Sequence, residues 1–245
     1  MRILLISGHS GTPYDPGATA TIDGTYYEEA TLNIEVVDRL EKLLRDKYGA
    51  HVIVYPRERD AYKDYKAGTL AFGSGIDYIL ECHFNACVQD YKGNGYTTGT
   101  EIYWPSRGQA TGAEDAILKR VCDVGFKNRG AMSMGLAVIN TAARAGIPAN
   151  LIEVCFIDDA DDMRIWLKNK DRICEAIAAG VAAHFGLKER PVKPPEDPWY
   201  IKDGSWTKAT ELKVVDGTRP GDPVTRAEAN VMMMRYLKLL KEGKV

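Results

Sequence analysis

The sequence predicts an α/β fold, in which a mostly parallel, twisted sheet of about six strands is flanked by helices and followed by a small, mainly helical module. Two observations predict the sheet. Short apolar runs alternate with segments of helical periodicity through residues 1–186. The run ILLIS at residues 3–7 is apolar almost throughout, as in strands that are buried on both faces. A third observation separates the module, because residues 187–198 hold four prolines in twelve positions and so predict an extended linker.

The expected elements alternate along the chain. Strands are expected at residues 2–7, 51–55, 76–83, 100–104, 136–140 and 150–156. Helices are expected at residues 26–48, 57–71, 110–125, 158–168 and 171–185. A loop that contains glycine and proline joins the first strand to the first helix over residues 8–25. The expected organisation is therefore one domain at 1–186, a linker at 187–198 and a module at 199–245.

Composition excludes several classes of partner. The chain of 245 residues has a formal net charge of −2, which gives no general attraction to nucleic acid or to a membrane surface. No apolar run approaches the roughly 18 residues that a membrane span needs. The start, MRILLISGHS, is too short for the apolar core of a signal peptide. We therefore expect a protein that is made in the cytoplasm, with no membrane span and no nucleic-acid partner.

The five cysteines are odd in number and form no CxxC pair. This pattern favours neither a disulfide framework nor a cysteine zinc cluster, and it is typical of small buried side chains. A cysteine nucleophile remains an alternative, since Cys82 and Cys155 lie near the residues chosen below.

Three side chains that can bind a metal stand near the ends of the expected elements: His9, Glu29 and His83. At about 100° per residue, Glu29 lies at the centre of the apolar stripe of its helix, and Glu28 is turned about 100° away towards solvent. The stripe consists of Leu32, Val36, Leu40, Leu43 and Leu44. A carboxylate that faces the core needs a bound cation or an ion pair, and both readings remain open. Two histidines and a glutamate are one of the known ligand sets of catalytic zinc.

Two further glutamates interrupt apolar strands. Glu81 shares a strand face with His83, so it either orients that ligand or lines a pocket wall. Glu153 lies within the apolar run ANLIEV, where burial raises the pKa of a carboxyl group. A glutamate whose pKa is near 7 can accept a proton from water and pass it to a leaving amine. The alternative for Glu153 is a salt-bridged residue at a strand end.

These segments together resemble the zinc-dependent N-acetylmuramoyl-L-alanine amidases of the α/β branch that bacterial autolysins and phage endolysins share. The resemblance covers residues 1 to about 186. Its motifs are GHSG at 8–11 with DPGA at 15–18, Glu29 with Asn33 four residues later, HFNA at 83–86 and LIE at 151–153. It implies that His9, Glu29 and His83 bind Zn²⁺ at the carboxyl ends of the strands and that Glu153 is catalytic. Glu81, Asn33 and Asn85 are then candidates for contacts with the ligands or the substrate.

The resemblance implies hydrolysis of the amide bond between N-acetylmuramic acid and L-alanine in peptidoglycan. A phage endolysin, which reaches the wall after release from the host cytoplasm, is the favoured reading. An autolytic or mother-cell amidase of a bacterium is one alternative. An inactive wall-binding protein and a related zinc exopeptidase are the others.

The C-terminal module carries a second resemblance. The turn DGTRP at 216–220 is followed by TRAE at 225–228, in which threonine and glutamate form a capping box. This order resembles an S-layer-homology repeat, which implies binding to a secondary cell-wall polysaccharide. Trp199, Trp206 and Arg226 are its candidate contacts, and core aromatics of a small domain are the alternative. Because one repeat has a small core, three alternatives stay open: the repeat is degenerate, it packs on the first domain, or it associates with other copies.

Overall fold

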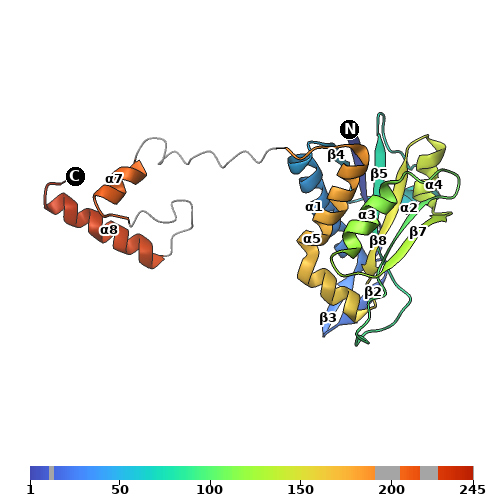
Figure 1. The fold of residues 1–245 in the computed structure, drawn as a ribbon, viewed down its shortest axis with the longest axis horizontal. Helices are drawn as coiled ribbons and strands as arrows, with labels where there is room; N and C mark the ends of the chain where they lie inside the picture. Colours follow the sequence, from blue (N-terminus) through green and yellow to red (C-terminus); the bar gives the residue numbers. More distant parts are fainter. Residues whose placement is uncertain (11–13, 191–204, 216–225, 245) are drawn as a thin grey trace. The chain divides into compact units, whose positions relative to one another are not determined.

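The computed structural model describes residues 1–10, 14–190, 205–215 and 226–244. Contacts divide the chain into two compact units, Met1–Pro191 and Val192–Val245. The first unit contains the sheet and the helices that flank it, and Figure 1 shows their arrangement. Each unit is described separately below.

The first unit is built on a six-stranded sheet in the order β4-β1-β5-β8-β6-β7. Its strands are β1 (Arg2–Ser7), β4 (His51–Val54), β5 (Tyr78–Asn85), β6 (Thr100–Pro105), β7 (Asn128–Met134) and β8 (Ala149–Phe156). All neighbouring pairs are parallel except β6 and β8, which are antiparallel. The predicted fold class, a mostly parallel six-stranded sheet flanked by helices, is therefore confirmed.

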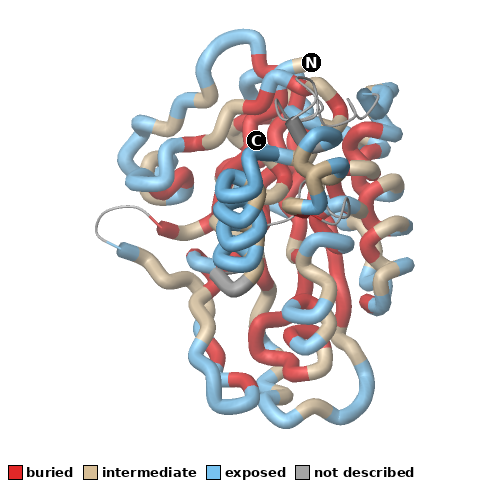
Figure 2. Tube along the Cα trace, turned by 90° about the vertical axis from the view of Figure 1, so that its left-hand side faces the viewer, coloured by how far each residue is buried: buried red, intermediate tan, exposed pale blue. Residues whose placement is uncertain are grey.

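Helices cover both faces of this sheet. They are α1 (Glu29–Lys42), α2 (Ala61–Ala67), α3 (Ala113–Cys122), α4 (Ala137–Arg144) and α5 (Ala160–Phe185). Figure 1 shows α1, α3 and α5 on one side and α2 and α4 on the other. Figure 2 shows the buried residues concentrated along the strands. In β1, Ile3 and Leu5 join one apolar cluster and Leu4 and Ile6 the other, as expected for a strand buried on both faces.

One predicted strand is wrong. Residues 136–140 lie at the start of α4, where Val138 and Ile139 are buried against the sheet. A short apolar run does not distinguish a strand from a buried helical turn. The strand in this region is β7, whose residues are half-buried or exposed. Because β7 is an edge strand, no apolar run marks it in the sequence.

Two boundaries also differ from expectation. The loop at 8–25 contains most of an antiparallel hairpin of β2 (Thr19–Ile22) and β3 (Thr25–Glu28), turned at Asp23 and Gly24, which both have positive φ. The first helix starts at Glu29 and ends in one π-helical turn, η1 (Leu43–Lys47). The predicted break between the two closing helices is present, because Asn169 has non-helical φ and ψ and makes a kink within α5.

The second unit contains α7 (Ser205–Glu211) and α8 (Arg226–Lys241). Trp199 and the turn at 216–220 lie outside the described residues, and so do the side chains of Trp206 and Arg226. The predicted S-layer-homology module therefore stays a prediction. Within the described ranges, no helix is long and apolar enough to cross a membrane.

Candidate active site

The first turn after β1 brings His9 against β5. The Gly8 amide donates to the carbonyl of Cys82, and the Asn33 side chain donates to the carbonyl of Gly8. A Cβ atom at position 8 would lie 2.1 Å from the imidazole of His83, so only glycine permits this approach. His9 itself has a φ of 62°, a left-handed conformation that is strained for a non-glycine residue. Asn33, a predicted contact, thus holds the turn that presents His9.

Three predicted ligands meet at one point. His9 Nε2 lies 3.2 Å from Glu29 Oε2, and His83 Nδ1 lies 2.8 Å from Glu29 Oε1. One potential ligand atom from each residue lies within 4.8 Å of the other two. Glu29 is the first residue of α1 and is only 4% exposed, whereas Glu28 is half-buried. The helical projection of Glu29 towards the core is therefore correct.

In each histidine, a second carboxylate lies against the outer nitrogen, the ring nitrogen that does not face Glu29. Asp15 Oδ2 lies 3.3 Å from His9 Nδ1, and Glu81 Oε1 lies 3.2 Å from His83 Nε2. Each imidazole thus has one nitrogen towards Glu29 and the other towards an orienting carboxylate, the arrangement typical of metal-bound histidines. Asp15 lies in the DPGA motif, but the motif predicts no role for it. Its position six residues after His9 in a glycine-rich loop was the only signal.

Hydrogen bonding decides the charge of Glu29. Burial alone would raise its pKa, but bonds from His83 and His9, with the attraction of their charged forms, lower that pKa well below the ordinary value. The amides of Ala18 and Phe84 also donate to this carboxylate. Burial lowers the pKa of His83, but its bonds to Glu29 and Glu81 outweigh burial and raise the pKa well above 6.5. The raised pKa of His83 favours its cationic form beside the buried Glu29 carboxylate.

Glu153 lies beside this group on the neighbouring strand. It pairs in register with His83 on β5 and with Glu101 on β6, so the three side chains share one face of the sheet. Burial raises the pKa of Glu153 to about 7. The attraction of His83 opposes this rise, and the negative charges of the three neighbouring glutamates, Glu29, Glu101 and Glu81, add to it. Its Oε2 is buried and has no hydrogen-bond partner in the described part of the chain. This carboxyl group can therefore hold or release a proton near neutral pH.

A second network was not foreseen from the sequence. Glu101 is 2% exposed and accepts hydrogen bonds from the Tyr103 hydroxyl, Arg129 Nε and the Asn85 side chain. The predicted contact Asn85 thus bonds to Glu101 and, in the described part of the chain, its side chain makes no hydrogen bond to the three clustered residues. Arg129 comes from β7, the strand that the apolar pattern missed.

Aspartates at the start of α5 fasten the loop that follows β5. Asp158 Oδ2 accepts the amides of residues 87, 88 and 89. Asp159 accepts the amide and hydroxyl of Thr98, and Asp162 accepts the amide of Gly99. Asp159 also lies close to Asp90 and Asp161, but its oxygens serve as acceptors for backbone groups. The aspartates therefore fix the loop beside the site.

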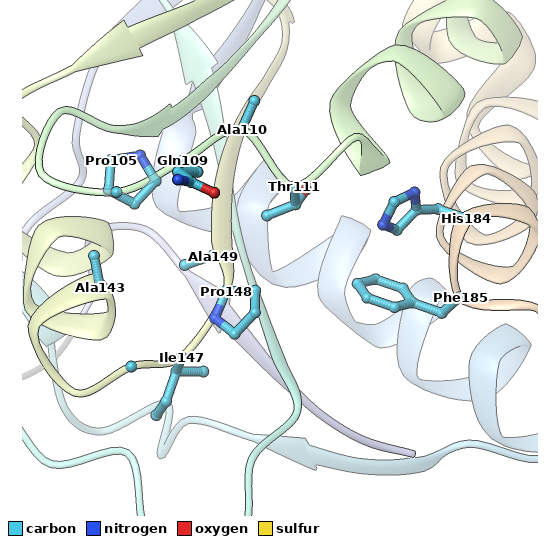
Figure 3. A pocket seen from close by; sticks show the side chains of 12 residues that line it. Pro105, Gln109, Ala110, Thr111, Ala143, Ile147, Pro148, Ala149, His184 and Phe185 are labelled. Atoms are coloured by element: carbon cyan, nitrogen blue, oxygen red, sulfur yellow. The ribbon is translucent and has the colours of Figure 1, made fainter.

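Two cavities differ in their relation to the site. A cavity of about 260 Å³ adjoins His9 and His83 and is also lined by Glu81, Asp60 and Leu151. A second cavity, of about 440 Å³, is shown in Figure 3. It is lined by Pro105, Pro148 and Phe185, and it contains none of the predicted site residues. Ala149, which lines that cavity, is the first residue of β8. The cavity therefore lies about four residues from Glu153 along the strand.

The alternative of a cysteine nucleophile finds no support. Cys82 and Cys155 are completely buried, and burial raises the pKa of each thiol well above its ordinary value. A thiol without access to solvent and without a lowered pKa is a poor nucleophile.

Comparison with known proteins places this site in a family. A protein of Clostridium perfringens is 29% identical over 229 residues, which are 91% of this chain but only 63% of that protein. The endolysin of Bacillus phage SPP1 is 27% identical over 196 residues, which are 77% of this chain and 67% of the endolysin. The catalytic domain of CD27L endolysin, described as targeting Clostridia difficile, superposes with a TM-score of 0.58 at 25% identity, over 75% of this chain and 97% of that domain.

The family profile described as N-acetylmuramoyl-L-alanine amidase matches residues 3–183, which include all three clustered residues and Glu153. The chain therefore belongs to the N-acetylmuramoyl-L-alanine amidase family.

Proposed function

We propose that this chain hydrolyses the amide bond between N-acetylmuramic acid and L-alanine in peptidoglycan, with Zn²⁺ held by His9, Glu29 and His83. The observation that carries the proposal is the convergence of these three side chains beside Glu153. Membership of the amidase family supports the choice of reaction and substrate.

The ligand atoms fit zinc. Two imidazole nitrogens and a carboxylate are a known catalytic set, and they leave one position for water or substrate. Asp15 and Glu81 each hold the outer nitrogen of one histidine, which fixes the ring that faces the centre. When bound, zinc would lower the pKa of a water molecule and polarise the carbonyl of the scissile amide.

Glu153 would carry the proton. With its pKa raised to about 7, its carboxylate accepts a proton from the attacking water. The same oxygen then delivers that proton to the departing amine of L-alanine. The cavity beside His9 and His83 supplies room for part of the substrate next to these groups.

The test is a digest of purified Gram-positive peptidoglycan by the full chain. Amidase action releases new amino-terminal alanine and no new reducing sugar ends. Reducing ends without new amines would indicate cleavage of the glycan and would contradict the proposal. Absence of both products from the zinc-loaded protein would favour an inactive wall-binding protein.

We also propose that the chain acts as an endolysin, made in the host cytoplasm and active on the wall after release. Similarity to the SPP1 endolysin supports this over the autolysin reading. Cells that produce the chain should lyse only when their membrane is permeabilised. Release of active protein from intact cells would favour an exported autolysin instead.

For the second unit we propose binding to a secondary cell-wall polysaccharide, with Trp199, Trp206 and Arg226 as contacts. The S-layer-homology resemblance of residues 216–228 supports it. Met233 and Met234 of α8 are 62% and 67% exposed, which supports association of copies through this unit. Sedimentation of the full chain with walls, before and after removal of that polysaccharide, tests the first proposal. Analytical ultracentrifugation tests the second.

A further inference from the structure

The guanidinium of Arg129 lies beside Glu101 on β6, and β6 is the neighbour of β8, the strand that carries Glu153. Arg129 Nε is 2.6 Å from Glu101 Oε2, and Glu101 pairs in register with Glu153 across β6 and β8. Paired residues of neighbouring strands face the same side of a sheet and are about 5 Å apart. His83, Glu153 and Glu101 therefore form a row that ends at an arginine.

Contacts hold Arg129 in place, but they use only part of the hydrogen-bonding capacity of its guanidinium. Its partner Glu101 is buried and is itself fixed by Tyr103 and Asn85. The guanidinium carbon also lies 4.8 Å from the ring centroid of Phe156. Only Nε donates to Glu101, and neither Nη nitrogen makes a hydrogen bond to the described residues. The side chain is 35% exposed, so part of it is accessible to a ligand.

A fixed guanidinium with two open N–H groups matches a carboxylate, which it can bind with two parallel hydrogen bonds. The need of the buried Glu101 for a cation explains the bond from Arg129 Nε. It does not explain why the two Nη nitrogens make no such bond among the described residues and lie near Glu153, the proposed general base. The row gives the spacing. Glu101 lies one strand spacing, about 5 Å, beyond Glu153, and the fork lies beyond Glu101 by a further hydrogen-bond length of about 3 Å.

The substrate has a carboxylate at a comparable distance. An extended peptide rises about 3.5 Å per residue, so a group on the second residue after the scissile carbonyl lies roughly 7 Å away. The carboxyl group of L-alanine is consumed in its own peptide bond. The first free carboxylate is therefore the α-carboxylate of the glutamate that follows.

We propose that Arg129 binds this α-carboxylate and makes the enzyme select stems in which it is free over stems in which it is a carboxamide. The inference rests on the proposed amidase function and names a specificity residue for it. A carboxamide offers one acceptor oxygen and no charge, so it loses one of the two bonds and the ionic attraction.

The experiment uses two peptidoglycans from one bacterial strain, prepared with and without the enzyme that amidates this carboxylate. The readout is kcat/KM for the release of amino-terminal alanine by the full, zinc-loaded chain. Arg129→Gln alone would leave Glu101 buried without its cation, so the main variant is the double substitution Glu101→Gln with Arg129→Gln. Arg129→Lys keeps the charge but removes the fork. Arg120→Gln is the matched control, because Arg120 lies on α3 and its side chain, among the described residues, bonds only to the carbonyl of Ala116.

The wild-type chain should favour the carboxylate form by roughly 10-fold or more. The double variant should bring the ratio close to one, Arg129→Lys should give an intermediate ratio, and Arg120→Gln should keep the wild-type ratio. Equal kcat/KM values for the two walls with the wild type, or an unchanged ratio in the double variant, would overturn the inference and leave the amidase function standing. No release of alanine from either wall would contradict the proposed function itself.

Discussion

His83 Nδ1 lies 2.8 Å from Glu29 Oε1, although the two residues are 54 positions apart in the chain. One comes from β5 and the other from the first turn of α1. Glycine at position 8 permits the contact, because any side chain there would collide with the His83 ring. The contact joins two proposed ligands through a carboxylate that remains ionised in the buried site.

Replacing His9 should abolish zinc binding. His9→Ala removes one of three ligands and the anchor of Asp15, so purified protein should contain little or no zinc. His51→Ala is the control, since His51 is exposed at the start of β4. Metal analysis after dialysis measures both. Full zinc occupancy in His9→Ala would remove His9 from the site.

Replacing Glu153 should separate catalysis from binding. Glu153→Ala should keep stoichiometric zinc and lose roughly 10²-fold or more in the rate of alanine release, because it removes the group proposed to move the proton. The rate assay and the metal analysis are done on the same preparation. Loss of zinc from this variant would mean that Glu153 is a ligand and that the assigned roles are wrong.

The orienting carboxylates should affect zinc affinity more than folding. Asp15→Asn and Glu81→Gln should each weaken zinc binding by roughly 10-fold or more, because each loosens one histidine. Asp23→Asn serves as the control, since Asp23 pairs with Arg164 at the hairpin turn. Competition with a zinc chelator gives the affinities. Wild-type affinity in both variants would show that the histidines need no such support.

Stability of the metal-free protein should depend on pH through Glu153. Its folded pKa of about 7 exceeds the ordinary value of 4.5, so the unfolded chain releases this proton first as pH rises. The contribution of Glu153 to the free energy of unfolding is therefore present below pH 4.5 and falls between 4.5 and about 7. Glu153→Gln removes this dependence, so its stability relative to wild type should increase from pH 5 to pH 8. Urea denaturation at both values measures the difference, and a constant difference would contradict the shifted pKa.

The parts of this structure that could be predicted are those marked by a pattern of apolar residues within a short stretch of sequence. The strands with apolar runs and the inward position of Glu29 follow from periodicity over a few residues. β7 could not be predicted, because an edge strand with mostly exposed residues has no apolar pattern. The apolar pattern at residues 136–140 predicts a strand wrongly, because five residues are too few to distinguish the period of a strand from that of a helix.

The site could be predicted only in part, because only some of its residues have a signal in the local sequence. His9, Glu29, His83 and Glu153 stood out through their residue types and motifs. Asp15 and Arg129 have roles that depend on contacts across the fold, and Arg129 reaches Glu101 only through the unpredicted β7. No spacing in the sequence encodes such a contact.

Zinc dependence of alanine release tests the central claim most directly. The full chain is stripped of metal with a chelator, dialysed and assayed on peptidoglycan before and after addition of one equivalent of Zn²⁺, with Glu153→Ala treated in parallel. We predict no release without metal, full recovery of the wild-type chain with zinc, and no recovery of Glu153→Ala. Full release by the metal-free chain, or recovery of Glu153→Ala to the wild-type rate, would contradict the account.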